Sequence, residues 1–426
     1  MTVSSAARPG VGRARACGVG CWALLALLAG ASLRADPAAD LRSPDGEMRA
    51  QAAWTIGSGD NRAAATSLVA FASDAYAPAR AAAAWGLGRL GDAGASAALA
   101  QLLADTNRAV RLAAARAVGT GGQKSFFGLL AARLDYEVRM EPDEQDAKRL
   151  VEHVYWREPD AGVRLAAIQS LGSLMVVDAI PALIYAMERE NSYNRVALVS
   201  VIEGFGPTAA GVCLGRIVPT PYDKEAFDKR MPLLIENGTL AVIAGRLGDE
   251  RCVPYLLKTL QIPRKGIGED KDLTELYIDT VTLLGRFREE AAAEPLAALL
   301  KETRVRQLSE ATQAALRAIG PAAAQPLAAN ADDWQLAPVF LPLLREPPLR
   351  SAAIHDTLVK FLASESDDVR REATETLGLY IHEGLFDEYD IPLLEAMYMD
   401  PDRTVRQICA RWKEKINTKL GDGSVQ

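Results

Sequence analysis

The sequence has little of what most catalytic sites are built from. It contains three histidines and five cysteines in 426 residues, and its aromatic content is 6%. Cys17 and Cys21 lie within residues 1–35, and no two of the remaining cysteines have the close spacing of a zinc site. A Gly-x-Ser-x-Gly nucleophile elbow, a phosphate-binding loop and a Rossmann glycine fingerprint are also missing from any strand-to-helix setting. These absences favour a non-catalytic protein, for which we expect no cofactor and no metal.

The chain also lacks an excess of positive charge. The formal net charge is −7, and residues 1–35 contain four arginines and no acid, which leaves −11 for the remainder. Proteins that bind nucleic acid do so with clusters of lysine and arginine, so we expect no nucleic-acid partner. What the chain does have is 49% hydrophobic and 24% charged residues, a balance typical of folded proteins.

Residues 1–35 have the pattern of a secretory signal. Three arginines, Arg8, Arg13 and Arg15, precede an apolar run over residues 16–33 that ends in small residues. Cleavage after Ala35 is favoured over cleavage after Ala31. We therefore expect a periplasmic or secreted protein. The alternative is an uncleaved signal that anchors the chain in the membrane through residues 16–33, a length at the short end of a spanning helix.

A ten-residue phrase of the form Val-Arg-x-x-Ala-Ala-x-x-Leu-Gly recurs along the chain. Its clearest copies begin at Met48, Ala79, Val110, Val163 and Val369. The closing glycines Gly57, Gly88 and Gly119 are 31 residues apart, which is a solenoid period. With the weaker copies that end at Gly206, Gly248, Gly285 and Gly320, and a last copy that begins at Val405, there are about ten units.

Each part of the phrase has a physical role. Apolar residues at its first, fifth, sixth and ninth positions share one helical stripe, and small side chains there let helices approach closely. The closing glycine is expected to end the helix in the left-handed conformation. A second helix follows, for example over residues 95–103 or 180–187, so each unit is a helical hairpin.

The second position of the phrase is an arginine in most copies. It falls at Arg49, Arg80, Arg111, Arg164, Arg370 and Arg406. Because acidic residues recur nearby, we interpret the arginines as a ladder of ion pairs between adjacent units. The alternative, a basic binding stripe, is disfavoured by the same acids.

The phrase resembles the short variety of HEAT repeat found in phycobilisome lyases, over roughly residues 41–416. The resemblance implies an all-α fold, a right-handed α-solenoid (superhelix) of about ten HEAT-like helical hairpins whose second helices line a concave face. This family includes scaffolds, adaptors, cargo binders and a few enzymes. A lyase-like or metal-dependent enzyme on the same scaffold is therefore the alternative, although only His382-Glu383 has the order of the paired ligands in HEAT-type di-iron hydroxylases.

Candidate binding residues come first from the seventh position of the phrase, which should project from the apolar stripe on the concave face. The row contains Trp54, Trp85, Arg116 and Gln169. Two tryptophans in adjacent units are unusual at a position that faces water. They are either hot spots for a partner protein or a cover for the N-terminal end of the core.

Three insertions break the period, near residues 136–159, 219–232 and 262–275. The first is acidic and contains the aromatic candidates Tyr136, Tyr155 and Trp156. Insertions in solenoids are frequent contact sites, and the alternative is a solvated hairpin or longer helix without a partner.

The sequence thus predicts an exported, non-catalytic scaffold or adaptor over residues 36–426. Its expected partner is another protein, with an envelope complex as the candidate, bound by the concave face or the insertion loops. The oxidising compartment would permit a disulfide between Cys213 and Cys252, but isolated cysteines on helices are more often small core residues.

Overall fold

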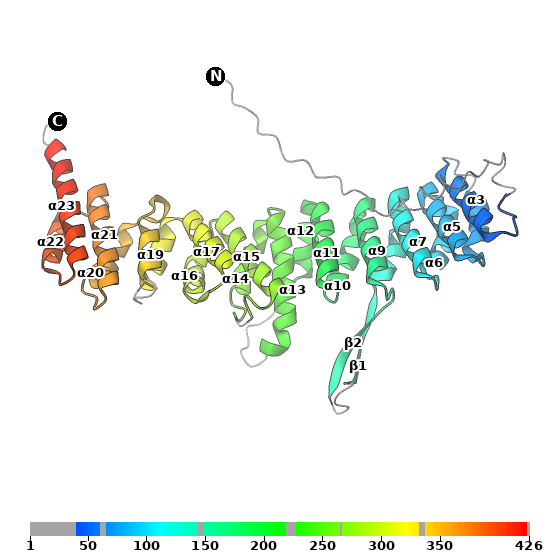
Figure 1. The fold of residues 1–426 in the computed structure, drawn as a ribbon, viewed down its shortest axis with the longest axis horizontal. Helices are drawn as coiled ribbons and strands as arrows, with labels where there is room; N and C mark the ends of the chain where they lie inside the picture. Colours follow the sequence, from blue (N-terminus) through cyan, green and yellow to red (C-terminus); the bar gives the residue numbers. More distant parts are fainter. Residues whose placement is uncertain are drawn as a thin grey trace, which may run out of the picture. The chain divides into compact units, whose positions relative to one another are not determined.

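The computed structural model describes residues 40–59, 65–143, 149–218, 227–264, 266–331 and 337–423. These residues divide into two compact units, the first ending at Gly121 and the second beginning at Gly122. In each unit, antiparallel helices stack as successive hairpins (Figure 1). The predicted all-α solenoid is confirmed. The signal at residues 1–35 lies outside the described residues.

The first unit contains five α-helices in the described part of the chain. They are α3 (Gly46–Ser58), α4 (Ala65–Val69), α5 (Ala77–Leu90), α6 (Ser96–Leu103) and α7 (Arg108–Gly121), with 3-10 turns at Ala70–Ser73 and Ala93–Ala95. Helices α3, α5 and α7 carry the repeated phrase and pack side by side.

The second unit continues with hairpins of the same kind. Its α-helices are α8 (Phe127–Ala131), α9 (Ala161–Leu174), α10 (Ile180–Met187), α11 (Ser192–Gly204), α12 (Pro207–Arg216), α13 (Phe227–Arg246), α14 (Val253–Thr259), α15 (Lys271–Arg286), α16 (Ala293–Glu302), α17 (Arg306–Ile319), α18 (Ala324–Ala329), α19 (Ala337–Leu344), α20 (His355–Leu362), α21 (Asp367–Glu383), α22 (Ile391–Ala396) and α23 (Arg403–Gly423). Its two strands are β1 (Tyr136–Pro142) and β2 (Leu150–Trp156). Short 3-10 turns join many of the helices.

The closing glycines of the clearest copies lie inside their helices, so the prediction is wrong for Gly57, Gly88 and Gly119. It is confirmed in two weaker copies, where Gly248 and Gly320 have positive φ just after the last residues of α13 and α17. Gly88 lies within α5, which ends in the left-handed conformation three residues later at Gly91, with φ 65°. A Cβ atom on Gly88 would lie 2.5 Å from Ala117 of α7. The same holds for Gly57, whose Cβ would lie 2.6 Å from the Cα of Gly86. Glycine is needed here because the backbones of adjacent first helices touch.

The arginine ladder is confirmed. Arg49 contacts Asp74 at 2.7 Å and Arg80 contacts Asp105 at 2.6 Å, each acid lying in the turn that follows the same hairpin. Each arginine also donates to backbone carbonyls in the turn before its own helix, as Arg80 does to Asp74 O at 2.8 Å. One guanidinium therefore joins two turns that lie about one repeat apart.

The most deeply buried of these arginines is in the second unit. Arg164 and Glu190 are 5% and 3% exposed, and the ion pair between them is 3.0 Å long. Arg164 also donates to Glu158 O at 2.9 Å and Pro159 O at 3.0 Å. Because the guanidinium is used in these contacts, the basic binding stripe is not supported.

The three insertions take different forms. The first is a β-hairpin, one of the alternatives considered above and an exception to the all-α fold. In the second, residues 219–226 lie outside the described residues, and residues 227–232 are the first turns of α13. The third ends sooner than predicted, because Asp270 caps α15 and residues 271–275 belong to that helix.

The cysteines of the described chain are core residues. Cys213, Cys252 and Cys409 are all buried free thiols, so the disulfide alternative is wrong. Burial raises the pKa of Cys213 to about 12 and that of Cys252 to about 11, which keeps both protonated and unreactive.

In the part of the chain that the structure describes, we found no helix with the length and hydrophobicity required to cross a bilayer.

Candidate protein-binding surfaces

The β-hairpin, called the arm below (β1 and β2), projects from the helices of the second unit (Figure 1). Its strands are antiparallel, with Tyr136 opposite Trp156 at the base and Pro142 opposite Leu150 at the far end. Residues 144–148, which join the strands, lie outside the described residues.

Aromatic and charged contacts fix the base of the arm. The ring of Tyr136 stacks on Tyr185 of α10, with 4.4 Å between centroids and 8° between planes. Its hydroxyl donates to Glu188 at 3.0 Å. On the other strand, the Arg164 guanidinium lies 4.4 Å from the centre of the Trp156 ring. The arm therefore leaves the helices in a defined direction.

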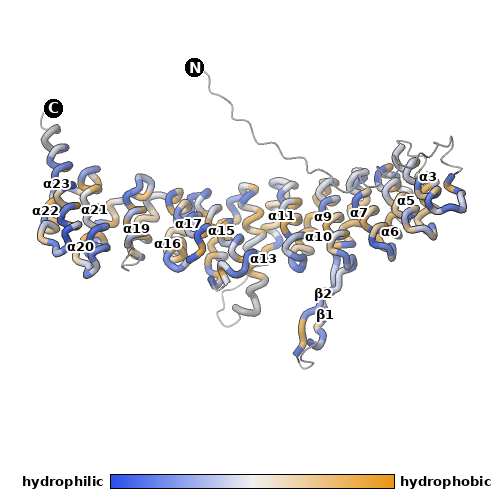
Figure 2. Tube along the Cα trace, in the orientation of Figure 1, coloured by the Kyte–Doolittle hydropathy of each residue, from blue (hydrophilic) through white to orange (hydrophobic). Residues whose placement is uncertain are grey.

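The side chains of the arm divide into an apolar and a polar face because neighbouring residues in a strand point to opposite sides. The apolar face consists of Tyr136, Val138, Met140, Pro142, Leu150, Val154 and Trp156, and it is interrupted by one charged residue, Glu152. At its far end Met140 and Leu150 are 56% and 57% exposed, and Figure 2 shows hydrophobic stretches along the arm. We call this the apolar face of the arm.

The polar face is held by contacts within the arm. Arg139 pairs with Glu137 at 2.8 Å and lies 4.8 Å from the centre of the Tyr155 ring. The Tyr155 hydroxyl donates to Glu141 at 2.8 Å, which raises the pKa of this tyrosine. Tyr155 thus keeps its own strand in register with its neighbour.

A second aromatic cluster lies in the first unit. The rings of Trp54 on α3 and Trp85 on α5 stack, with 3.9 Å between centroids and 19° between planes. The glycine contact between α3 and α5 described above allows this close approach. Arg89 lies 5.7 Å from the centre of the Trp85 ring and donates to Gly57 O at 2.7 Å. Trp54 remains 40% exposed, so part of this stack is open to solvent.

The predicted candidates thus fall into separate places. Trp54, Trp85 and Arg116 lie on the first helices α3, α5 and α7 of the first unit, and Arg116 is exposed. Gln169 is exposed on α9 in the second unit. The candidates from the seventh position of the phrase lie on the first helices of their hairpins. The resemblance, in contrast, assigns the concave face to the second helices. Tyr136 and Trp156 are brought together at the base of the arm, with Tyr155 on the opposite face.

Sequence reasoning missed the residues that make the arm apolar at its far end. Val138, Met140 and Leu150 were not among the candidates, although Tyr-Glu-Val-Arg-Met alternates apolar and polar residues as a strand with one buried face would. The prediction for this insertion used its acids and aromatic residues. The alternation of apolar and polar residues was the signal that could have identified the strand.

A pair of carboxyl groups lies beside the base of the arm. Glu188 accepts the hydrogen bond from Tyr136 and has Arg216 at 3.8 Å. Burial and the neighbouring Glu188 raise the pKa of Glu236 on α13 to about 7, against the opposing effect of Arg216 and Arg189. Near neutral pH Glu236 therefore keeps its proton for part of the time.

This pair predicts a pH-dependent stability. Because Glu236 holds its proton more tightly in the folded protein than in the unfolded chain, its own contribution to stability is fully present below the unfolded pKa of 4.5 and is lost as pH rises through about 7. Glu236→Gln cannot ionise, so we expect it to raise the melting temperature by a few degrees at about pH 8 and by much less at about pH 5. Thermal melts at both pH values test this, with the exposed Glu250→Gln as control. Equal effects of the two substitutions would contradict it.

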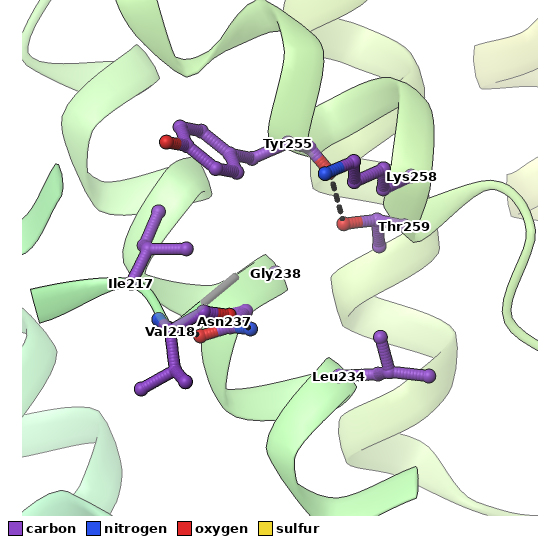
Figure 3. Close-up of a pocket in the computed structure, with 8 residues that line it drawn as sticks. All are labelled: Ile217, Val218, Leu234, Asn237, Gly238, Tyr255, Lys258 and Thr259. Atoms are coloured by element: carbon purple, nitrogen blue, oxygen red, sulfur yellow. Dashed lines mark hydrogen bonds between the residues drawn. The ribbon is translucent and has the colours of Figure 1, made fainter. Parts of the chain in front are cut away.

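A small pocket, open to solvent, lies between α13, α14 and the residues that follow α12 (Figure 3). Its lining consists of Ile217, Val218, Leu234, Asn237, Gly238, Tyr255, Lys258 and Thr259. The Asn237 amide exchanges two hydrogen bonds with the backbone of Val218, of 3.2 and 2.9 Å, and so joins α13 to the segment after α12. Thr259 donates to Tyr255 O at 3.0 Å within α14. Asn237 and Thr259 thus bond to the backbone that forms the walls of the pocket.

The histidines do not form a metal centre in the described chain. No group of three or more histidine, cysteine, aspartate or glutamate side chains lies close enough there to hold a metal ion. His355 lies between Asp356 at 3.0 Å and Asp390 at 2.9 Å, and these carboxylates raise its pKa. This contact joins α20 to the turn before α22.

Comparisons with known proteins agree with the repeat architecture. Residues 37–119 match the family model of HEAT repeats. Among solved structures, the chain is similar to the complex of CpcE and CpcF of phycocyanin lyase from Nostoc sp., with 20% identity and a TM-score of 0.32 over 60% of this chain and 97% of that one. No curated protein matches it.

Two further structures are similar at the same level. Yeast importin-beta (Kap95p) is 12% identical, with a TM-score of 0.32, over 90% of this chain and 57% of that one, so this chain spans little more than half of its length. Human deoxyhypusine hydroxylase is 18% identical, with a TM-score of 0.25, over 84% and 97%. Likenesses this weak indicate no activity and no partner for this chain. The match to the HEAT-repeat family model thus covers the helices of the first unit, and the second unit is built from helical hairpins of the same kind.

Proposed function

We propose that this chain is a non-catalytic scaffold that holds another protein through the arm. The observation that supports this is the apolar face, which is open at Met140 and Leu150 while the base is fixed to α9 and α10. An isolated two-stranded hairpin is only marginally stable in water, so the anchored base is what keeps this surface in place.

Burial of the exposed apolar side chains at the far end of the arm would favour recognition of a partner. Full burial of a methionine or leucine side chain is worth about 1.5–3 kcal/mol relative to leaving it exposed. Contiguous apolar surface with a polar rim is typical of protein interaction sites. Val138, Met140 and Leu150 supply the apolar centre, and the paired charges of Glu137 and Arg139 lie behind it.

Export is part of the same proposal. It rests on the arginines and the apolar run within residues 1–35, and it makes an envelope protein or complex the partner to look for. N-terminal sequencing of the protein recovered from the envelope fraction tests this, and we expect the first residue to be Asp36. A chain that retains residues 16–33 would instead favour the membrane-anchored alternative.

Affinity capture from envelope extracts tests the binding function. We expect Met140→Glu/Leu150→Glu to lose the captured partner at an unchanged melting temperature, because both side chains are exposed. Tyr389→Glu, which alters a side chain that is 91% exposed far along the chain, is the matched control and should keep it. If the double variant still captured the partner and Trp54→Ala did not, the partner would bind at the tryptophan stack and not at the arm.

A further inference from the structure

Strand β2 is an unprotected sheet edge. The described part of the chain has a single two-stranded sheet, so each strand has one side that pairs with no other strand. Natural proteins commonly protect such edges with proline, lysine or a short strand. Strand β1 carries Pro142, whereas β2 reads Leu-Val-Glu-His-Val-Tyr-Trp over seven residues, without proline or lysine. Its β-branched and aromatic residues favour strand pairing.

The pairing within the arm determines which backbone groups face outward. Asp143 N donates to Arg149 O at 2.8 Å, and Arg157 N donates to Asp135 O at 2.9 Å. Hydrogen-bonded and non-hydrogen-bonded residue pairs alternate along an antiparallel ladder. The odd-numbered residues of the two strands therefore direct their N–H and C=O groups toward each other. The even-numbered residues of β2, among them Leu150, Glu152 and Val154, therefore direct their N–H and C=O groups away from β1.

The edge of β1 is less able to accept another strand. The Tyr185 hydroxyl donates to Tyr136 O at 3.5 Å, and Pro142 has no N–H to donate. Both ends of the outward side of β1 are thus occupied or incapable of pairing. The outward N–H and C=O groups of β2 belong to residues whose side chains form the apolar face. One added strand could therefore bond these backbone groups and cover the apolar side chains at the same time.

We infer that the edge of β2 takes up an extended segment of the partner protein as a third strand. This inference rests on the proposed protein-binding function and specifies how the arm would perform it. Main-chain hydrogen bonds would supply register, and alternate apolar side chains of the partner would lie beside Leu150 and Val154 on the apolar face.

Charge limits what the added strand can carry. Glu152 is one of the outward positions of β2 and pairs with Arg189 at 2.8 Å. An antiparallel pairing of two arms centred on this residue would place two Glu152 side chains opposite each other, which is destabilising. A partner strand with a neutral or basic residue there avoids this repulsion. The expected segment therefore alternates apolar and polar residues and has no acid opposite Glu152.

The test uses the full exported chain and a synthetic peptide that alternates valine and threonine, with one central lysine on the valine side. We expect an excess of peptide to slow amide hydrogen exchange at Leu150, Glu152 and Val154 by at least about tenfold. The amides of Val151, His153 and Tyr155, already bonded within the arm, should change much less. Val154→Pro removes one outward N–H without removing a bond inside the arm, so it should abolish the protection. Val138→Pro, the matched change at an outward position of β1, should leave it intact.

The outcomes separate this inference from the proposed function. Protection at β1, protection that survives Val154→Pro, or no protection on either strand would overturn strand addition. Dimerisation of the chain without peptide, abolished by Val154→Pro, would also overturn it by making a second copy the occupant. If Met140→Glu/Leu150→Glu loses the envelope partner while Val154→Pro keeps it, the scaffold function stands and strand addition fails.

Discussion

Replacing Arg164 by alanine is expected to lower the free energy of unfolding of the second unit by about 3–5 kcal/mol. The substitution leaves the Glu190 carboxylate buried without its main partner, since the ion pair of 3.0 Å is lost. It also removes the donors that Glu158 O and Pro159 O use. A buried charge without a partner costs more than the pair contributes, because water cannot replace the missing guanidinium.

Urea denaturation, followed by circular dichroism, measures this effect as a lower transition midpoint. The matched control is Arg306→Ala, which removes an exposed ion pair with Glu310 one helical turn away. Such pairs contribute about 0.5 kcal/mol or less, so the control should hardly move the midpoint. If the two variants lowered the transition midpoint by similar amounts, the contribution of an ion pair to stability would not depend on its burial.

The same variant has a consequence for the arm. Because Arg164 lies 4.4 Å from the centre of the Trp156 ring, its removal also takes away one of the contacts that fix the base of β2. The stability of the second unit and the direction of the arm are therefore linked through one guanidinium.

Gly285→Ala is expected to destabilise the second unit by about 3 kcal/mol, at the upper end of what overpacking costs. Gly285 lies on α15, and an added Cβ would lie 2.6 Å from the Cα and 2.8 Å from the Cβ of Ala315 on α17. Backbone atoms cannot move aside as a flexible side chain can, so the two helices would have to separate. Every apolar contact between them would weaken as a result.

Gly211→Ala is the control, with an effect of opposite sign. Gly211 lies within α12, and an added Cβ there has nothing within 4 Å. Alanine is favoured over glycine within a helix by about 0.5–1 kcal/mol, so this variant should be slightly stabilised. Denaturation midpoints that moved in the same direction for both variants would refute close backbone approach as the role of the repeated glycines.

The repeated phrase allowed the hairpins to be predicted in detail. The second helix expected at residues 180–187 is α10 with the same bounds, and the arginines meet acids about one repeat away. These features depend on residues close together in one unit or its neighbour, and the same side chains recur at the same spacing. Local periodicity therefore carries the information that the packing uses.

The role of Gly57, Gly88 and Gly119 was predicted wrongly, whereas the positive φ expected of a closing glycine is found at Gly248 and Gly320. A glycine near the end of an apolar stripe is compatible with either a left-handed helix end or a close helix contact, and both fit the same local sequence. The choice is made by the neighbouring helix: Ala117 lies where a side chain on Gly88 would have to go.

The sequence by itself determined the repeat, its helical hairpins, the ion-pair ladder and the position of the first insertion, because each is written as a pattern that recurs or is interrupted. Only the tertiary structure decided that the first insertion is an anchored arm. Tyr136 meets Tyr185 and Trp156 meets Arg164 across the fold. Neither contact is encoded by local spacing, since each depends on where the packed helices place a side chain beside the strands.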